Sequence, residues 1–232
     1  LTIIAALLIF TVYRFLDESK EKDSSVSLRP LKVMHGYLEV LKDPNFLMYG
    51  LAGSFTMAAM FTYITGSPFV IMELYGFSET AFGWIFGFNA FGFILGSQIN
   101  RFWLKKRDSN SISKISAVLL MVVTGLLTIS AFLNILSAPA LIALLFSSLF
   151  LMGFLNPNTT AQALEPFDKN AGIASALIGS FRMLSGALAS GLISLFFNGT
   201  IFPLILIMTS CALLVFTLLQ FSGQKKLMLK TS

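Results

Sequence analysis

Four long runs without a single charged residue constrain this chain more than any other feature of its sequence. Two further runs of similar length, 81–104 and 171–199, carry one charge each, Arg101 and Arg182. A run of about 18 or more mostly apolar residues is long enough to cross the hydrocarbon layer of a membrane as a helix. The sequence therefore predicts an all-α polytopic membrane protein with six complete spans. The four uncharged runs cover residues 46–72, 115–136, 138–164 and 200–223.

The remaining segments define the organisation that we expect around these spans. Residues 1–15 are apolar but too short for a complete span, so we interpret them as the end of a preceding helix and the chain as a fragment. Residues 16–44 form a long cytoplasmic loop, 45–223 the helical bundle and 224–232 a cytoplasmic tail. Within the loop, the spacing of apolar residues over 31–42 predicts a short amphipathic helix on the membrane face, with a plain solvated loop as the alternative.

The basic residues predict how the chain sits in the membrane. The net charge is +5 and 56% of residues are hydrophobic. If the spans alternate in direction, every Lys and Arg except Arg182 falls in the loops on one side or at the helix ends beside them. That side is then cytoplasmic and includes the C-terminus. We expect an integral plasma membrane protein, in a bacterial inner membrane, that contacts membrane lipid and binds no nucleic acid.

Cysteine and histidine, which are common in catalytic and metal sites, are nearly missing. Cys211 is the only cysteine and His35 the only histidine. The sequence contains no Ser-His-Asp arrangement, no Cys/His spacing typical of metal sites and no phosphate-binding glycine loop. We therefore expect no metal, no other cofactor and no enzymatic activity.

The six spans divide into two groups of three that cross the membrane in opposite orders. This arrangement is typical of a 3+3 inverted repeat. The first span of each group has a proline near its C-terminal end, Pro68 and Pro157, beside polar residues. Because proline cannot donate a backbone hydrogen bond, the pair predicts helix breaks that face protein or water. The alternative is that both prolines simply end helices near the headgroups.

Arg182 is the strongest anomaly inside a span. It lies eleven residues after Ala171, which is ~16 Å along a helix and about half of a ~30 Å hydrocarbon core. A charge at that depth is costly, so Arg182 is expected to line the transport cavity or pair across it. The alternative is a side chain that extends to the cytoplasmic interface. Small residues share the predicted face of Arg182 and indicate close helix contact: Ser175, Gly179, Gly186 and Ala189.

Acidic residues are missing from the middle of every span. A carrier that moves protons usually needs a carboxylate within the membrane, whose pKa burial can raise. If the protein uses protons, we expect that carboxylate in the part of the transporter that precedes this chain.

Three blocks of sequence carry a family resemblance. They are FTYITGSPFVIMELYGFS (61–78), FGFNAFGFILGSQINRF (86–102) and NPNTTAQALEPFDKNAGIASALIGS (156–180). With these blocks the chain resembles the C-terminal half of a major facilitator superfamily transporter, of the Bcr/CflA drug:proton antiporter type. The resemblance implies twelve helices in two halves, with residues 1–15 as the end of helix six and a missing N-terminal half as partner. It also implies that Gly96, Arg101 and Lys105 are the remnant of a loop motif. Asn100 stands where that motif often has Asp, which argues against a strong salt bridge there.

The resemblance further implies export of hydrophobic or cationic small molecules by alternating access, in exchange for protons. Two alternatives remain open: a metabolite or anion carrier of the same superfamily, and an inactive half-transporter or membrane interaction partner. Apart from Arg182, the polar residues that we expect in the substrate cavity or its gates could equally hold helices together. These candidates are Tyr63, Ser67, Asn89, Asn156, Asn158, Gln162 and Arg182.

Overall fold

The computed structural model describes residues 2–15, 30–167 and 170–221. The expected linker over 16–29 and the tail over 224–232 lie outside these residues. The described chain falls into two compact units, of which the first ends at His35 and the second begins at Gly36 and holds the six long helices. The first unit contains α1 (Thr2–Phe15), whose 14 residues are too few for a complete span, as the sequence predicts.

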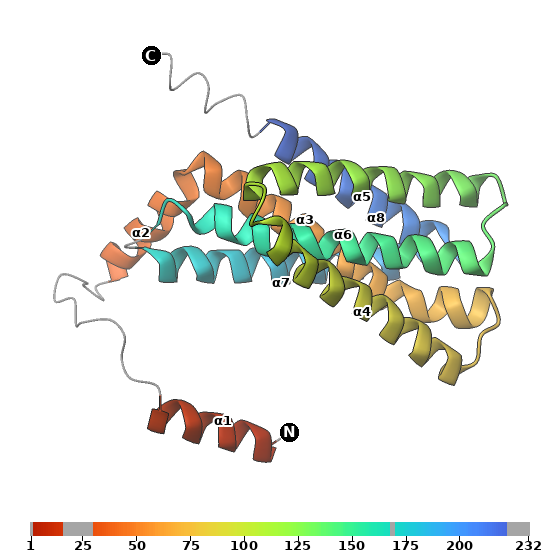
Figure 1. Ribbon diagram of the computed structural model, residues 1–232, viewed down its shortest axis with the longest axis horizontal. Helices are drawn as coiled ribbons and strands as arrows, with labels where there is room; N and C mark the ends of the chain where they lie inside the picture. The colour runs from red at the N-terminus through yellow and green to blue at the C-terminus, as the bar shows by residue number, and fades with distance from the viewer. Residues whose placement is uncertain (1, 16–29, 168–169, 222–232) are drawn as a thin grey trace. The chain divides into compact units, whose positions relative to one another are not determined.

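The six predicted spans are all present as helices. Among the described residues six helices are long and apolar enough to cross a membrane, and none of this part of the chain is a strand. The prediction of an all-α protein with six spans is therefore confirmed. After α1, the elements in Figure 1 are α2 (Pro30–Lys42), α3 (Pro44–Pro68), the π-helix η1 (Phe69–Leu74), α4 (Glu79–Trp103), α5 (Ser109–Phe132), α6 (Ala138–Leu164), α7 (Ala171–Leu195) and α8 (Phe202–Phe221).

Polar residues at the membrane surface fix where the helices begin. The carboxylate of Asp43 accepts a hydrogen bond of 2.7 Å from the backbone N–H of Phe46, and Pro44 occupies the first turn of α3. Asp108 caps α5 in the same way by accepting from the N–H of Ser111 at 2.9 Å. Such caps satisfy donors that have no partner inside the helix. They allow short turns between consecutive spans.

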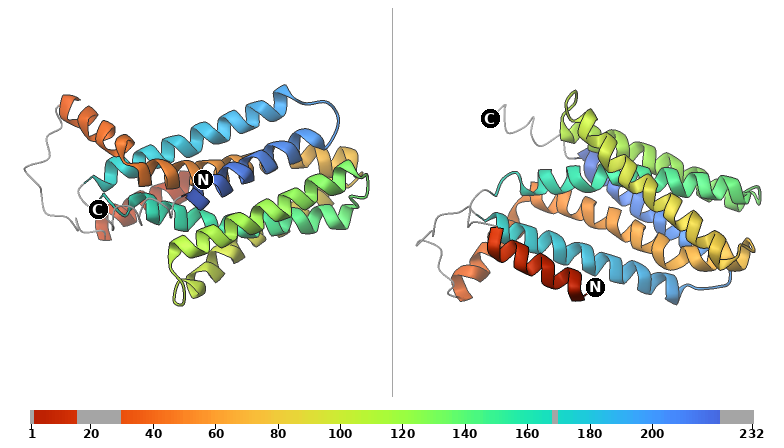
Figure 2. Two further views of the ribbon diagram at one scale, coloured as in Figure 1. Left: turned by 90° about the horizontal axis from the view of Figure 1, so that it is seen from above. Right: turned by 60° about the horizontal axis from the view of Figure 1, so that its bottom comes forward.

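The bundle has an internal two-fold pattern of packing. Helix α3 packs against α7 and α8, while α6 packs in the same way against α4 and α5. The two central helices also contact each other, and so do α5 and α8. Exchanging the first triplet, α3 to α5, with the second, α6 to α8, leaves this pattern unchanged. The views in Figure 2 agree, since the connections α3–α4, α5–α6 and α7–α8 gather at one end of the bundle. The predicted 3+3 inverted repeat is confirmed.

Two glycines let α4 and α6 approach until their backbones touch. A Cβ atom placed on Gly96 would lie 2.0 Å from the carbonyl oxygen of Phe150. One placed on Gly153 would lie 2.3 Å from the carbonyl oxygen of Phe93. Only glycine fits both positions, and such close crossings are a common means of holding helices together in membranes.

The predicted break at Pro157 is wrong, because α6 continues through it to Leu164. The proline removes one backbone bond, because it has no N–H to donate to the carbonyl of Gly153, and the helix continues on either side of it. The side chain of Asn158 donates to the carbonyl of Phe154 at 2.8 Å, and the Thr159 and Thr160 hydroxyls donate to the carbonyls four residues before them at 2.8 and 2.7 Å. These bonds are additional to the backbone bonds of the helix and do not replace the one that the proline removes.

Pro68 does not interrupt the helical path either. It changes the hydrogen-bond pattern, since α3 gives way there to η1, and the N–H of Tyr75 bonds five residues back to the carbonyl of Val70 at 3.2 Å. The Tyr75 hydroxyl then donates to the carbonyl of Leu136 at 2.8 Å. This bond ties the end of η1 to the α5–α6 connection.

Helix α2 covers the helix that the sequence predicts over 31–42. Met34 and Leu38 are exposed, while Gly36 and Val40 are buried. A Cβ on Gly36 would lie 2.7 Å from the side chain of Ile173 on α7. The glycine therefore permits a close contact with the bundle, and the exposed apolar side chains are free to contact lipid.

Candidate functional site

Helix α6 carries polar side chains on two different sides. Asn158 and Gln162 are buried, with exposed fractions of 2% and 7%. Asn156 and Thr160 are only partly buried, and Pro157 is exposed. Residues four apart share a helix face, whereas residues two apart do not. The candidates on α6 therefore belong to two clusters with different neighbours.

The first cluster joins α6 to α4 and α5. The side-chain amide of Asn158 donates to Oδ1 of Asn100 on α4 at 2.7 Å, and its own Oδ1 accepts from the Ser109 hydroxyl on α5 at 2.9 Å. One turn further, the Gln162 amide donates to the Ser113 hydroxyl at 3.1 Å. Asn158 and Gln162 thus hold three helices together rather than line an open cavity. In the sequence, Asn100 stands out only as a departure from a motif. In the structure, its side chain accepts the hydrogen bond that joins α4 to this cluster.

The second cluster surrounds Arg182 near the middle of α7. One guanidinium nitrogen, Nη2, donates to the Thr160 hydroxyl at 2.7 Å and to the backbone carbonyl of Asn156 at 3.3 Å. A Cβ on Gly53 of α3 would lie 3.1 Å from the same nitrogen, so this glycine leaves room for the guanidinium. The side chain therefore turns toward the C-terminal part of α6. No carboxylate pairs with it among the described residues.

Two buried polar atoms in this second cluster have no hydrogen-bond partner in the described part of the chain. They are Nε of Arg182 and Oδ1 of Asn156. A guanidinium has five donors, and burying unused donors or acceptors costs free energy. The cluster therefore has an unused donor and an unused acceptor close together, which is the pattern that a bound polar group would satisfy.

The predicted small-residue face of α7 is correct in its second half only. Gly186 and Ala189 are buried, and a Cβ on Gly186 would lie 2.6 Å from the ring of Phe61. Ser175 and Gly179 are exposed, and nothing lies within 4 Å of a Cβ on Gly179. Before Arg182, α7 packs through other residues: Ala174 and Ile178 are buried, and the Phe181 ring lies 6.2 Å from that of Phe46 on α3 between centroids.

Tyr63 and Asn89 form a polar contact between α3 and α4. The Asn89 amide donates to the Tyr63 hydroxyl at 3.1 Å, and the Tyr63 ring stacks on Phe86 at 5.6 Å between centroids. Both side chains are buried. Ser67 is also fully buried, and its hydroxyl has no partner among the described residues. This group is separate from the Arg182 cluster.

The structure does not bring the proposed loop-motif residues together. Gly96 is a packing residue inside α4, as described above. Arg101 is exposed in the last turn of that helix, and Lys105 follows the helix with its ammonium 5.7 Å from the centre of the Phe102 ring. Arg101 makes no ion pair with any described residue.

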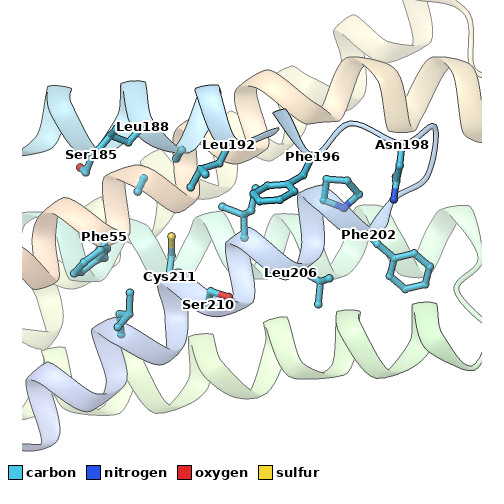
Figure 3. Close-up of a pocket in the computed structure, with 15 residues that line it drawn as sticks. Phe55, Ser185, Leu188, Leu192, Phe196, Asn198, Phe202, Leu206, Ser210 and Cys211 are labelled. Atoms are coloured by element: carbon cyan, nitrogen blue, oxygen red, sulfur yellow. The ribbon is translucent and has the colours of Figure 1, made fainter. Parts of the chain in front are cut away.

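An apolar groove lies beside the packed core, between α7 and α8 and over α3. Its volume is about 590 Å³. In Figure 3, Leu188 and Leu192 line it from α7, Phe196 from directly after that helix, and Leu206 and Cys211 from α8. It has no charged side chain in its lining. A groove of this kind suits an apolar compound or a lipid chain. For a metal ion, the described residues include no group of three or more His, Cys, Asp or Glu side chains.

Thr160 is not among the candidates that the sequence predicts, and Asn100 is there only a departure from a motif. In the structure, each makes the shortest contact between side chains in its cluster. A signal for Thr160 exists in its spacing of four from Asn156, which places both on one face. No comparable signal identifies Asn100, because its partner Asn158 is on another helix.

Comparisons with known proteins point to one family. The family model described as Major Facilitator Superfamily matches residues 1–190. Over 218 residues, which are 91% of this chain and 52% of the relative, the chain is 26% identical to the Bicyclomycin resistance protein homolog of Haemophilus influenzae. It is 30% identical over 160 residues to the Uncharacterized MFS-type transporter YdgK of Bacillus subtilis, covering 67% of this chain and 39% of that protein. The chain thus spans about half the length, or less, of these curated relatives.

Proposed function

This chain belongs to the major facilitator superfamily, and on that premise we propose that it forms the C-terminal half of a Bcr/CflA-type transporter. The transporter exports hydrophobic or cationic small molecules in exchange for protons. The observation that carries this proposal is the similarity to a bicyclomycin resistance protein homolog along 91% of the chain. The chain works together with an N-terminal half that supplies the facing wall of the cavity. The protein lies in the plasma membrane, with its basic loops and C-terminus in the cytoplasm.

The proton-binding carboxylate of this transporter belongs to the N-terminal half. The acidic residues within the six spans are Glu73 and Glu79, and both are exposed near helix ends. Buried carboxylates are the usual proton carriers within membranes, because burial brings their pKa toward physiological pH. In this proposal, the C-terminal half contributes substrate contacts and helix movement but no proton site.

Arg182 gives specific support to a second candidate, a carrier of anionic metabolites. A partly buried guanidinium with no carboxylate partner among the described residues favours a negatively charged ligand group over a positive one. The adjacent Oδ1 of Asn156 would accept a hydrogen bond from such a ligand. The two candidates differ in the sign of charge that the cavity accepts, so charge variants at Arg182 separate them.

The test uses the complete transporter in proteoliposomes with an imposed pH gradient. We expect Arg182→Gln to reduce transport strongly and Arg182→Lys to restore it only partly, because lysine retains the charge but not the forked geometry. Lys114→Gln, which removes a positive charge at the start of α5, is the matched control and should transport normally.

The choice of substrates decides between the two candidates. If Arg182→Gln abolishes uptake of organic anions and leaves that of hydrophobic cations intact, the anion carrier is correct. Normal transport by both Arg182 variants at normal expression would rule out a role for Arg182 in either. Robust transport by the 232-residue chain alone would contradict the need for a second half.

A further inference from the structure

A basic hollow with aromatic walls lies where α4 ends and α5 begins. Its lining is Phe102, Trp103, Lys106, Arg107 and, from α5, Ile115. Its volume is about 550 Å³. It lies at the opposite end of the helices from the α7–α8 turn that borders the apolar groove, and it shares no lining residue with that groove. None of the transport candidates lies in it.

The charges in this hollow are unbalanced. Its two cationic side chains, Lys106 and Arg107, pair with no carboxylate among the described residues, and Arg101 and Lys105 lie close by in the sequence. Asp108 follows directly, but its carboxylate accepts hydrogen bonds from the backbone N–H and the hydroxyl of Ser111, at 2.9 and 2.8 Å. Lys106 and Arg107 are exposed. The hollow therefore presents free cationic donors to an incoming anion.

The aromatic side chains indicate which kind of anion fits. Phe102 is 62% exposed and Trp103 is 46% exposed, at the point where the α4 span ends. Exposed aromatic residues at a span end lie at the level of the lipid headgroups. A small aqueous anion gains nothing from such walls, whereas a phospholipid places its phosphate on the cations and its chains on the apolar side chains. Basic pockets between transmembrane helices on the cytoplasmic side are suited to anionic headgroups.

We propose that this hollow, which we call the α4–α5 basic pocket, binds an anionic phospholipid. Lys106 and Arg107 hold the phosphodiester of the headgroup, and an acyl chain follows Phe102 and Ile115 into the bilayer. The proposal requires that the helices span a membrane but is independent of what the protein transports.

The two tryptophans of the chain provide the assay. They are Trp84 and Trp103, so in a Trp84→Phe background Trp103 alone reports on the pocket. The full chain is placed in phosphatidylcholine nanodiscs that contain equal mole fractions of brominated phosphatidylglycerol or brominated phosphatidylcholine. Bromine quenches Trp103 only at close range. We expect stronger quenching by the brominated phosphatidylglycerol.

Matched charge variants test whether the pocket, and not the general positive charge, is responsible. Lys106→Gln should lower the preference for phosphatidylglycerol about fivefold, the effect expected for one basic residue near an anionic surface. Arg107→Lys, which keeps the charge, should retain most of the preference. Lys42→Gln removes one charge from the same side of the membrane but outside the pocket, and should leave the preference unchanged.

Three results would overturn the proposal. One is equal quenching by the two brominated lipids. Another is an equal loss of preference in Lys42→Gln and Lys106→Gln, which would indicate only general attraction to the surface. The third is relief of quenching by soluble glycerophosphate or inorganic phosphate, which would identify a free-anion site instead. Both lysines are exposed, so we expect both variants to retain the wild-type helix content by circular dichroism.

Discussion

The close contact between α4 and α6 allows a sharp test of the packing. In Gly96→Ala, the new methyl group would begin 2.0 Å from the carbonyl oxygen of Phe150. Contacts shorter than about 3.0 Å are essentially never observed, so the helices must separate by at least about 1 Å. The opposing atoms are backbone atoms and cannot move aside as a side chain would.

The expected loss follows from two opposing terms. Overpacking of this kind costs about 1–3 kcal/mol, and a rigid backbone contact belongs at the upper end of that range. Alanine in place of glycine within a helix returns about 1 kcal/mol. The net destabilisation is then about 2 kcal/mol. For a chain of this size that corresponds to a melting temperature roughly 4–8 °C lower.

Cys211 supplies the assay for Gly96→Ala. It is the only cysteine and is buried, with an exposed fraction of 7%, so a thiol-reactive fluorescent dye reports unfolding in detergent. Gly125→Ala in α5 is the matched control, because nothing lies within 4 Å of a Cβ there. It should melt about 2–4 °C above the wild type, since only the helix-propensity term applies. If Gly96→Ala melted as high as Gly125→Ala, the backbone contact described here would be refuted.

Three further predictions concern stability; the first two use the same melting assay, and the third is followed by circular dichroism, because the thiol does not react with the dye at low pH. Asn158→Ala and Asn100→Ala should each lower the melting temperature. A double-mutant cycle should give a coupling free energy of about 0.6–1.7 kcal/mol between the two side chains, and additive effects would mean that the two amides do not interact. Tyr63→Phe should lower the melting temperature by a few degrees, because it leaves the amide donor on α4 without its acceptor; an unchanged value would contradict the contact. Bonds from the backbone N–H and the hydroxyl of Ser111 lower the pKa of Asp108. Its stabilising effect is therefore complete above the unfolded pKa of about 3.9 and is lost as the pH falls through the lower folded value. Asp108→Ala should thus be clearly less stable than the wild type at pH ~6, and the difference should shrink toward pH ~2; a constant difference would show that the carboxylate charge is not involved.

The spans and their symmetry could be predicted because they depend on properties that are local in the sequence. A run of apolar residues specifies a membrane helix whatever surrounds it, since the bilayer leaves no other way to satisfy the backbone. The order of the spans then specifies the inverted repeat. Neither inference requires knowledge of which residues touch.

The candidate site could be predicted only in part, because the role of a polar residue depends on the neighbour it meets. Asn156 and Asn158 are two positions apart and were grouped in one prediction. Asn156 lies on the side of α6 that faces Arg182, whereas the side chain of Asn158 bonds to Asn100. The sequence contains the helical spacing that separates them, but not the positions of α4 and α7. A proline beside polar residues likewise predicts a break, yet α6 remains helical through Pro157.

The two-fold packing pattern relates two of the polar contacts between helices to each other. Two seams where packing is slight are related by the symmetry: α3 against α4, and α6 against α7. Each seam is bridged by a donor near the middle of the second helix of its triplet, Asn89 in one case and Arg182 in the other. Each donor reaches a hydroxyl in the C-terminal half of the first helix, Tyr63 or Thr160. Where apolar packing is slight, one hydrogen bond makes up a large share of the contact, so each of these bridges contributes much of the interaction across its seam.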